Sequence, residues 1–180
     1  TLAARASDDI ELRDTSSGKL LRTMNVCATR LAWSPDGKIL AAATEKGIVL
    51  CDPAAGSVLR TLTGPSGAIA VIAWSPDSRS LAGSPHVAPS RGDRMVFIWD
   101  AGSGSVRRRF DPRINHPAHL AWPRDGRTLG LANRESTGMY DADTGRLIRM
   151  LDTSIDDLSA DGRLAVLGGP AFVRLLSLPE

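Results

Sequence analysis

Cysteine is scarce in this chain. Its 180 residues include only Cys27 and Cys51, and neither belongs to a Cys-x-x-Cys pair or to a Cys/His cluster. Two cysteines are too few for the disulfide framework of a secreted protein. We therefore expect a reducing compartment and a cytoplasmic protein.

A large excess of one charge and a long apolar run are also lacking. The chain has 22 basic and 20 acidic side chains, and a net charge of +2 does not suit a polybasic nucleic-acid surface. The longest apolar run, residues 68–74, is far shorter than the ~18 residues of a membrane span. We expect neither a nucleic-acid partner nor a membrane. The apolar share of 42% is that of a globular protein.

Motifs for catalysis or cofactor binding are missing as well. There is no HExxH, no GxSxG and no Cys–His arrangement, and Gly102 and Gly104 lack the third glycine of a phosphate loop. Asp141 and Asp143 do not fit a calcium loop, because the following glycine comes one position early and no Glu closes the loop. We expect no enzyme, no cofactor and no metal.

Two motifs recur with a period of about forty residues. The first combines an apolar residue, Ala and Trp with a Ser-Pro-Asp-Gly turn, and it occurs at residues 31–37, 72–78, 120–126 and, more weakly, 157–162. The second is an Asp, a Gly four residues later and an Arg four residues after that. It occurs as Asp14, Gly18 and Arg22; Asp52, Gly56 and Arg60; Asp100, Gly104 and Arg108; and Asp141, Gly145 and Arg149. The fixed register of the two motifs defines one repeated structural unit.

Each repeat predicts four short strands. In the first complete repeat, residues 29–33, 39–44, 48–52 and 58–62 are apolar or alternating and are separated by turn residues. We name these strands a, b, c and d in chain order. A four-stranded antiparallel sheet cannot bury both faces alone, so it must stack on its neighbours. The class is all-β, and the radial arrangement of such sheets is a β-propeller.

We divide the chain into three complete blades with a partial blade at each end. The boundaries are 1–28 (partial), 29–64, 65–111 with an inserted loop, 112–153, and 154–180 (partial). The first unit lacks strand a and the last lacks strand d, so the two partial blades do not combine into one four-stranded blade that would close a ring within the chain. We favour part of a longer propeller; a five-blade closure and closure by a second copy are the alternatives. An open end would expose an apolar face and so implies a partner.

The repeat resembles the WD-repeat family. Residues 95–100 resemble its third strand ending in Trp-Asp, and residues 73–77 resemble its first strand and turn. Only one unit has the Trp-Asp pair, and the usual Gly-His pair is absent, so the sequence is a degenerate member that is also similar to YVTN-type propellers. The resemblance implies a non-catalytic protein-interaction and scaffolding module within a larger bacterial protein. The alternative is a propeller with ligand-binding or hydrolytic activity in its axial channel.

Several repeated residues predict structure instead of chemistry. Equivalent turn aspartates of different blades lie on a ring, so we interpret them as turn residues and not as a catalytic carboxylate pair; they are Asp36, Asp77, Asp125 and Asp161. We expect Trp33, Trp74 and Trp122 to be buried between blades. Cys51 is expected to be a small buried thiol. The arginines at 107–109 are expected to form a solvated outer edge.

One region departs from the repeat. The b-to-c connection of the second complete blade carries an insertion at residues 84–94, which should emerge on the same rim as the d-to-a connection at residues 111–117. Together they predict a raised ridge for an acidic protein partner, formed by Arg91, Arg94, Arg113 and His116. The alternative is a tolerated insertion whose charge is incidental.

Overall fold

The computed structural model describes residues 1–6, 9–62, 64, 68–85, 95–114, 117–152, 157–158, 164–169 and 172–177, with side chains up to residue 152. Every regular element in these ranges is a β-strand, and the strands form five antiparallel sheets. Three sheets have four strands and the two at the ends have three. The predicted all-β class, with three complete and two partial blades, is confirmed.

The sheets follow the chain in order. The first holds β1 (Leu2–Ala6), β2 (Asp9–Arg13) and β3 (Leu20–Met24). The second holds β4 (Arg30–Trp33), β5 (Leu40–Thr44), β6 (Gly47–Asp52) and β7 (Ser57–Leu62). The third holds β8 (Ile69–Trp74), β9 (Ser80–Pro85), β10 (Val96–Asp100) and β11 (Val106–Phe110). The fourth holds β12 (His119–Ala121), β13 (Thr128–Ala132), β14 (Thr137–Asp141) and β15 (Leu147–Leu151). The fifth holds β16 (Asp157–Leu158), β17 (Leu164–Gly169) and β18 (Phe172–Ser177).

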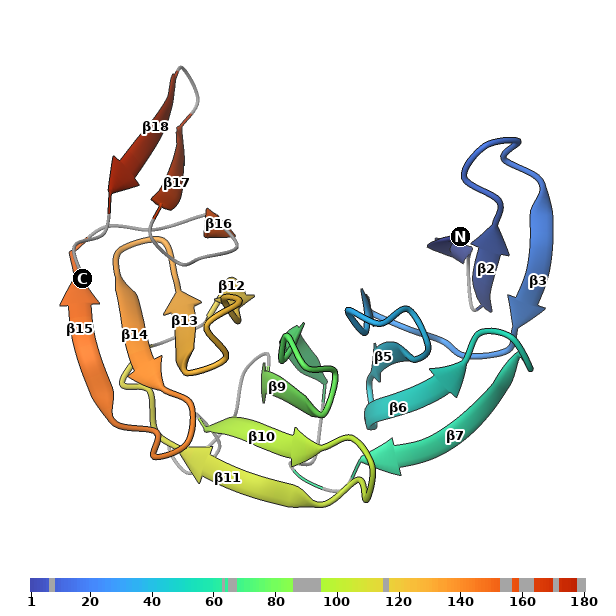
Figure 1. The fold of residues 1–180 in the computed structure, drawn as a ribbon, viewed down its shortest axis with the longest axis horizontal. Coiled ribbons are helices and arrows are strands. Elements are labelled where there is room, and N and C mark those ends of the chain that lie inside the picture. The colour runs from blue at the N-terminus through green and yellow to red at the C-terminus, as the bar shows by residue number, and fades with distance from the viewer. Residues whose placement is uncertain are drawn as a thin grey trace.

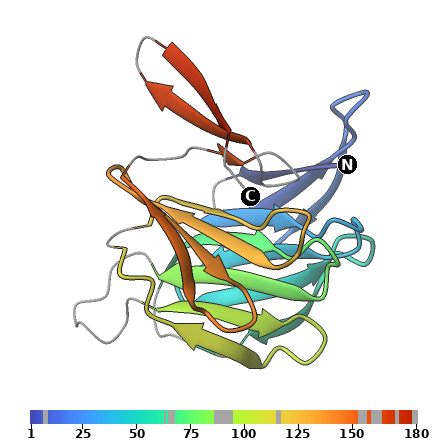
Figure 2. The same ribbon diagram turned by 60° about the vertical axis from the view of Figure 1, so that its left-hand side comes forward.

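The sheets stack side by side around a common axis. Figure 1 shows them as an arc, with the d strands β3, β7, β11 and β15 on its outer side and an opening between the first and last sheets. On the inner side, strand β4 contacts β8, β8 contacts β12, and β12 contacts β16. In the side view of Figure 2 the sheets lie face to face. These are the radially ordered blades that the repeat predicts.

The c-to-d turns explain the second sequence motif. The Oδ1 of Asp52 accepts the backbone N–H groups of Ala54 and Ala55 at 2.7 and 2.9 Å, and Gly56 closes the turn with a φ of 72°. The carboxylates of Asp14, Asp100 and Asp141 accept equivalent bonds. Each c and d strand then pairs with a bulge at the same repeat position. Asp and Gly are therefore required by the turn itself.

The core lies between neighbouring sheets. On β5, Leu40 and Ala42 pack toward the first sheet, whereas Ala41 and Ala43 pack toward the third. All four are fully buried. Leu50 of β6 belongs to the cluster shared with the third sheet, and a further cluster joins the third sheet to the fourth. Because successive side chains of a strand face opposite sides, each sheet is buried on both faces only when it has two neighbours.

The repeated tryptophans are not equivalent in burial. Trp74 is 6% exposed, and its Nε1 donates across the interface to the carbonyl of Ala32 in the second sheet at 3.0 Å. Trp33 and Trp122 are only half-buried at the edge of their clusters. The prediction of burial between blades is confirmed for Trp74, whereas Trp33 and Trp122 pack against the clusters between sheets but are only partly buried. For Trp122 the reason is local, since its Nε1 donates to Gly126 within its own turn at 3.1 Å.

Cys51 is fully buried, as predicted for a small core thiol. Its side chain lies in the cluster between the first and second sheets. Burial disfavours the thiolate and raises the pKa of Cys51 to about 11.

The close packing of Gly145 gives a test of the fold. Its φ is 73°, and a Cβ built there would lie 2.7 Å from the Phe110 Cγ of the neighbouring sheet. Gly18 has a similar φ of 68°, but nothing lies within 4 Å of its Cβ position. Gly145→Ala should therefore lower the free energy of unfolding by about 1–3 kcal/mol more than Gly18→Ala, because only the former adds an overpacked contact to the backbone strain. Urea denaturation of both variants measures this difference. Equal losses would contradict the packing between these sheets.

Candidate interaction surfaces

The predicted ridge is only partly within the described residues. Arg91, Arg94 and His116 lie outside them, so their place on a ridge stays a prediction. Arg113 is described and exposed, in the connection between β11 and β12. This connection is a d-to-a loop, so it lies on the rim where the d-to-a and b-to-c loops emerge.

The loop holds Arg113 at a fixed place. Pro112 and Ile114, its neighbours in the chain, are both buried, and Ile114 is 3% exposed within the cluster of the third and fourth sheets. The backbone N–H of Arg113 donates to Oδ1 of Asp111 at 2.8 Å, and Arg113 has a φ of 56°. A non-glycine residue rarely adopts a positive φ, and the buried neighbours and the turn bond together maintain it here.

Tyr140 fastens this loop to the fourth sheet. Its hydroxyl donates to the carbonyl of Pro112, and its ring lies 5.2 Å from that of Phe110 between centroids. Burial, with a smaller contribution from the negative charge of Asp111, raises the pKa of Tyr140 to about 12. The phenol therefore stays neutral and serves as a hydrogen-bond donor.

A cavity of about 580 Å³ opens on the opposite rim, between the third and fourth sheets. Its walls come from the a-to-b turns of both sheets, the c-to-d turn of the fourth sheet, and strands β10 and β11. Three guanidinium groups lie in the wall, from Arg107, Arg108 and Arg124, and we call this cavity the arginine groove.

The arginine groove was missed by the sequence analysis, which placed residues 107–109 on a solvated edge. The arginines at 107–109 are all exposed, as expected. Arg107 also reaches across the sheet, where its Nη1 donates to Oγ of the buried Ser80 at 2.9 Å. Arg107 and Arg108 line a cavity and are not simply solvated. Comparing the same position across the repeats could have revealed Arg107, because the other outer strands carry Leu or Ile there.

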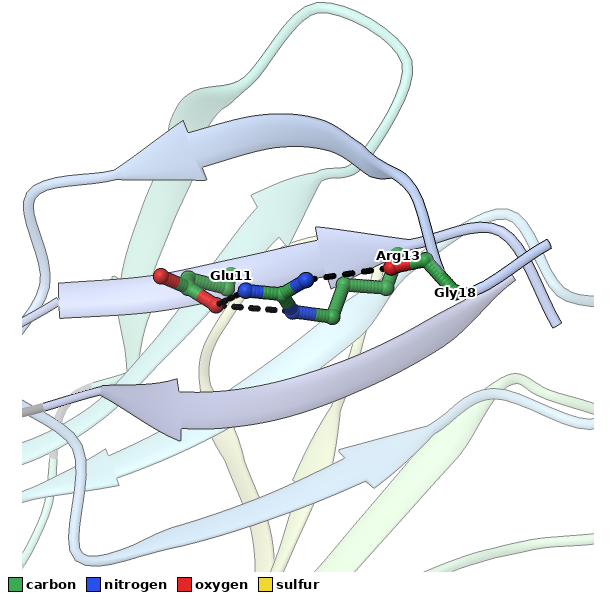
Figure 3. Close-up of polar contacts among 3 residues, drawn as sticks. All are labelled: Glu11, Arg13 and Gly18. Carbon is green, nitrogen blue, oxygen red and sulfur yellow. Dashed lines mark hydrogen bonds and ion pairs between the residues drawn. The ribbon is translucent and has the colours of Figure 1, made fainter.

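The described part of the chain has one ion pair. Oε2 of Glu11 lies 2.6 Å from Nη2 of Arg13, and Nη1 of the same arginine donates to the carbonyl of Gly18 at 3.0 Å (Figure 3). Arg13 stands just before the c-to-d turn of the first sheet, where Trp99 stands in the third. Its guanidinium is therefore occupied in holding a turn.

The turn aspartates act in structure, as predicted. Hydrogen bonds from the hydroxyls of Ser34 and Ser75 hold the pKa values of Asp36 and Asp77 below their ordinary range. Asp125 accepts the backbone N–H groups of residues 127 and 128. Asp161 lies outside the described residues.

A search of the described residues gave two further results. It found no group of three or more His, Cys, Asp or Glu side chains able to hold a metal ion. It also found no helix of the length and apolar character that crossing a membrane requires.

The chain's single tyrosine allows a direct check of the Arg113 loop. Because the folded pKa of Tyr140 is raised from 10 to about 12, the neutral phenol stabilises the fold fully below pH 10, and this contribution is lost as the pH rises toward 12. Tyrosinate absorbance of the folded protein should titrate with a midpoint near pH 12 while circular dichroism shows intact strands. Tyr140→Phe should show no such titration and a weaker loss of stability over the same range. A midpoint near 10 in the folded protein would contradict the buried bond to Pro112.

Two family models match the chain. One, described as the WD40 domain of anaphase-promoting complex subunit 4, matches residues 4–77, and the other, described as the WD domain, G-beta repeat, matches residues 56–100. A curated relative, a WD repeat-containing protein of the cyanobacterium Synechocystis sp., is 28% identical over 96 residues. The aligned segment is 53% of this chain and 26% of the relative, so the chain spans about a quarter of that relative's length. The repeat motifs, the stacked sheets and these matches agree: the chain belongs to the WD-repeat family.

Proposed function

We propose that the chain is a non-catalytic protein-binding module, and that it binds its partner with the rim that carries the b-to-c and d-to-a connections. WD repeats in general mediate protein–protein interactions. The observation that carries the proposal is the fixed presentation of Arg113, an exposed arginine between two buried residues of a loop fastened by Tyr140. Arginine is enriched at protein interfaces, and an ordered loop loses little entropy on binding.

The ridge formed by Arg91, Arg94, Arg113 and His116 is part of the proposal. Its basic groups would suit an acidic protein surface. The insertion before β10 and the loop of Arg113 belong to connections on one rim, because b-to-c and d-to-a connections of an antiparallel blade leave the same end of the sheet.

We also propose that residues 1–180 belong to one propeller domain of a larger protein. The sheets at the two ends have three strands where the inner ones have four, and further strands, from the rest of a longer chain or from a second copy, would complete them. A bacterial cytoplasm is the proposed location. The cyanobacterial relative and two free cysteines support this.

The rim proposal is tested by reversing one charge. Arg113→Glu should weaken binding of a protein that the wild-type chain captures from an extract of the producing cells by about tenfold or more, because an anchor arginine becomes a repelling carboxylate. Lys38→Glu makes the same reversal on an exposed turn of the opposite rim and should leave binding unchanged. Titration of the purified, identified partner measures the affinity of each variant.

Equal affinities of the wild type and Arg113→Glu would overturn the assignment of the partner to this rim. Circular dichroism and urea denaturation of both variants exclude loss of the fold as the cause of any weakening.

A further inference from the structure

The arginine groove departs from the repeat at its tryptophan. Between the second and third sheets, Trp74 is buried and donates to Ala32 of the neighbouring sheet. Between the third and fourth sheets, Trp122 turns to Gly126 of its own turn and is only half-buried. A cavity of about 580 Å³ lies beside Trp122, a size within the ~300–1,000 Å³ range of ligand sites.

Two of its arginines replace apolar residues of the repeat. Arg107 stands three positions after the turn glycine, where the other outer strands have Leu21, Leu59 and Ile148. Arg124 stands two positions after the tryptophan, where the other turns have Pro35 and Pro76. The repeat fold requires neither guanidinium, because the same backbone forms with leucine and proline at these places.

Arg108 occupies the arginine position of the repeat, but it is not the side chain nearest to the turn glycine of the next sheet. Its equivalents Arg22 and Arg60 are the nearest side chains over the turn glycines Gly56 and Gly104 of the next sheet. In this interface the ring of Phe110 takes that place, over Gly145. Arg108 instead lines the cavity, and its positive charge helps to lower the pKa of Asp141 in the neighbouring turn.

A second cavity, between the first and second sheets, shows the contrast. It measures about 660 Å³, and Arg22 is the one charged side chain in its wall, beside Leu21, Trp33 and Pro35. Nη1 of Arg22 donates to the carbonyl of Ala55 at 3.3 Å. The cavity between the first and second sheets thus lacks the concentration of arginine found in the arginine groove.

No arginine of the groove forms an ion pair among the described residues, although the positive charges of Arg107 and Arg108 help to lower the pKa values of Asp100 and Asp141. The ion pair found among the described residues joins Glu11 and Arg13, in the first sheet. Asp77 and Asp125 also line the groove, but their carboxylates accept hydrogen bonds within their own turns, from Ser75 and from Thr128. A guanidinium has five N–H donors, and Arg107 uses one of them on Ser80, so donors remain for an outside anion. The aspartates, with Asp143, add acceptor oxygens at the rim.

We propose that the arginine groove binds an extended peptide segment bearing acidic side chains, which are carboxylates or phosphates. Guanidinium groups bind both kinds of oxyanion in bidentate fashion. A peptide suits the mixed lining, because its N–H groups can donate to the aspartate oxygens while its acidic side chains meet the arginines. A DNA backbone offers only acceptor oxygens, so it would provide no donors to the aspartate oxygens. This site lies on the rim opposite Arg113, so it goes beyond the function proposed above.

Fluorescence anisotropy with defined peptides tests the groove on the full chain. The probes are a labelled Glu-Ser-Gly repeat, the same repeat with phosphoserine in place of Glu, and a Gln version without charge. We expect the two acidic probes to bind and the Gln probe to bind at least about tenfold more weakly, since hydrogen bonds to charged groups contribute about that factor. The tighter of the two acidic probes identifies the anion as carboxylate or phosphate.

Variants that restore repeat residues provide the matched comparison. Arg107→Leu introduces the residue of Leu21 and Leu59, and Arg124→Ala removes the turn guanidinium; each should weaken acidic-probe binding about tenfold. Arg109→Leu makes the same charge change on the same strand outside the cavity wall and should alter binding less than about twofold. Urea denaturation checks that the variants remain folded, and because Arg124 lies in an exposed turn, its variant tests the groove even if Arg107→Leu is unstable.

Three results would overturn the proposal. They are equal binding of the Gln probe, retention of binding in both groove variants, and tighter binding of a single-stranded oligonucleotide than of either peptide. None of them affects the function proposed above, whose test is at Arg113 on the other rim.

Discussion

Packing of apolar side chains between neighbouring sheets is the interaction on which this structure depends. Alternate residues of β5 face opposite neighbours, so Leu40 and Ala42 are buried by the first sheet and Ala41 and Ala43 by the third. A sheet separated from its neighbours would expose both of these rows to water, at a cost of roughly 25 cal/mol for each Å² of apolar area. The turns, rims and loops are in place because the sheets hold one another.

That dependence explains why binding surfaces can differ from one interface to the next. The backbone is set by the turn Asp and Gly of each repeat and by buried alternate residues, so outer-strand and turn positions can change without loss of the fold. Position 107 carries Arg where Leu59 stands in the preceding blade, and the Trp122 indole donates within its own turn instead of to the neighbouring sheet. On the opposite rim, the d-to-a loop of the third blade is pinned by Pro112 and Ile114 and presents Arg113.

Features that repeat were predictable from the sequence, and so were changes of residue type within the repeat, but the packing of side chains across an interface was not. The strands ending at Trp74 and Asp100, the turns and the buried Cys51 follow from local pattern and from period-two alternation. The arginine groove could not be predicted. Its shape depends on which carbonyl accepts the hydrogen bond of the Trp122 indole and on the packing of Phe110 over Gly145. Both are choices of side-chain conformation across an interface, which no sequence spacing encodes.

Native-state hydrogen exchange of a Leu50→Ala variant tests the mutual support of the sheets most directly. Leu50 is fully buried in the cluster that the second and third sheets share. The account predicts that amides of β9 and β10 lose protection together with those of β5 and β6, by the same free energy of about 2–5 kcal/mol. If β9 and β10 keep their wild-type protection while β5 and β6 lose theirs, each sheet is stable by itself and the account is wrong.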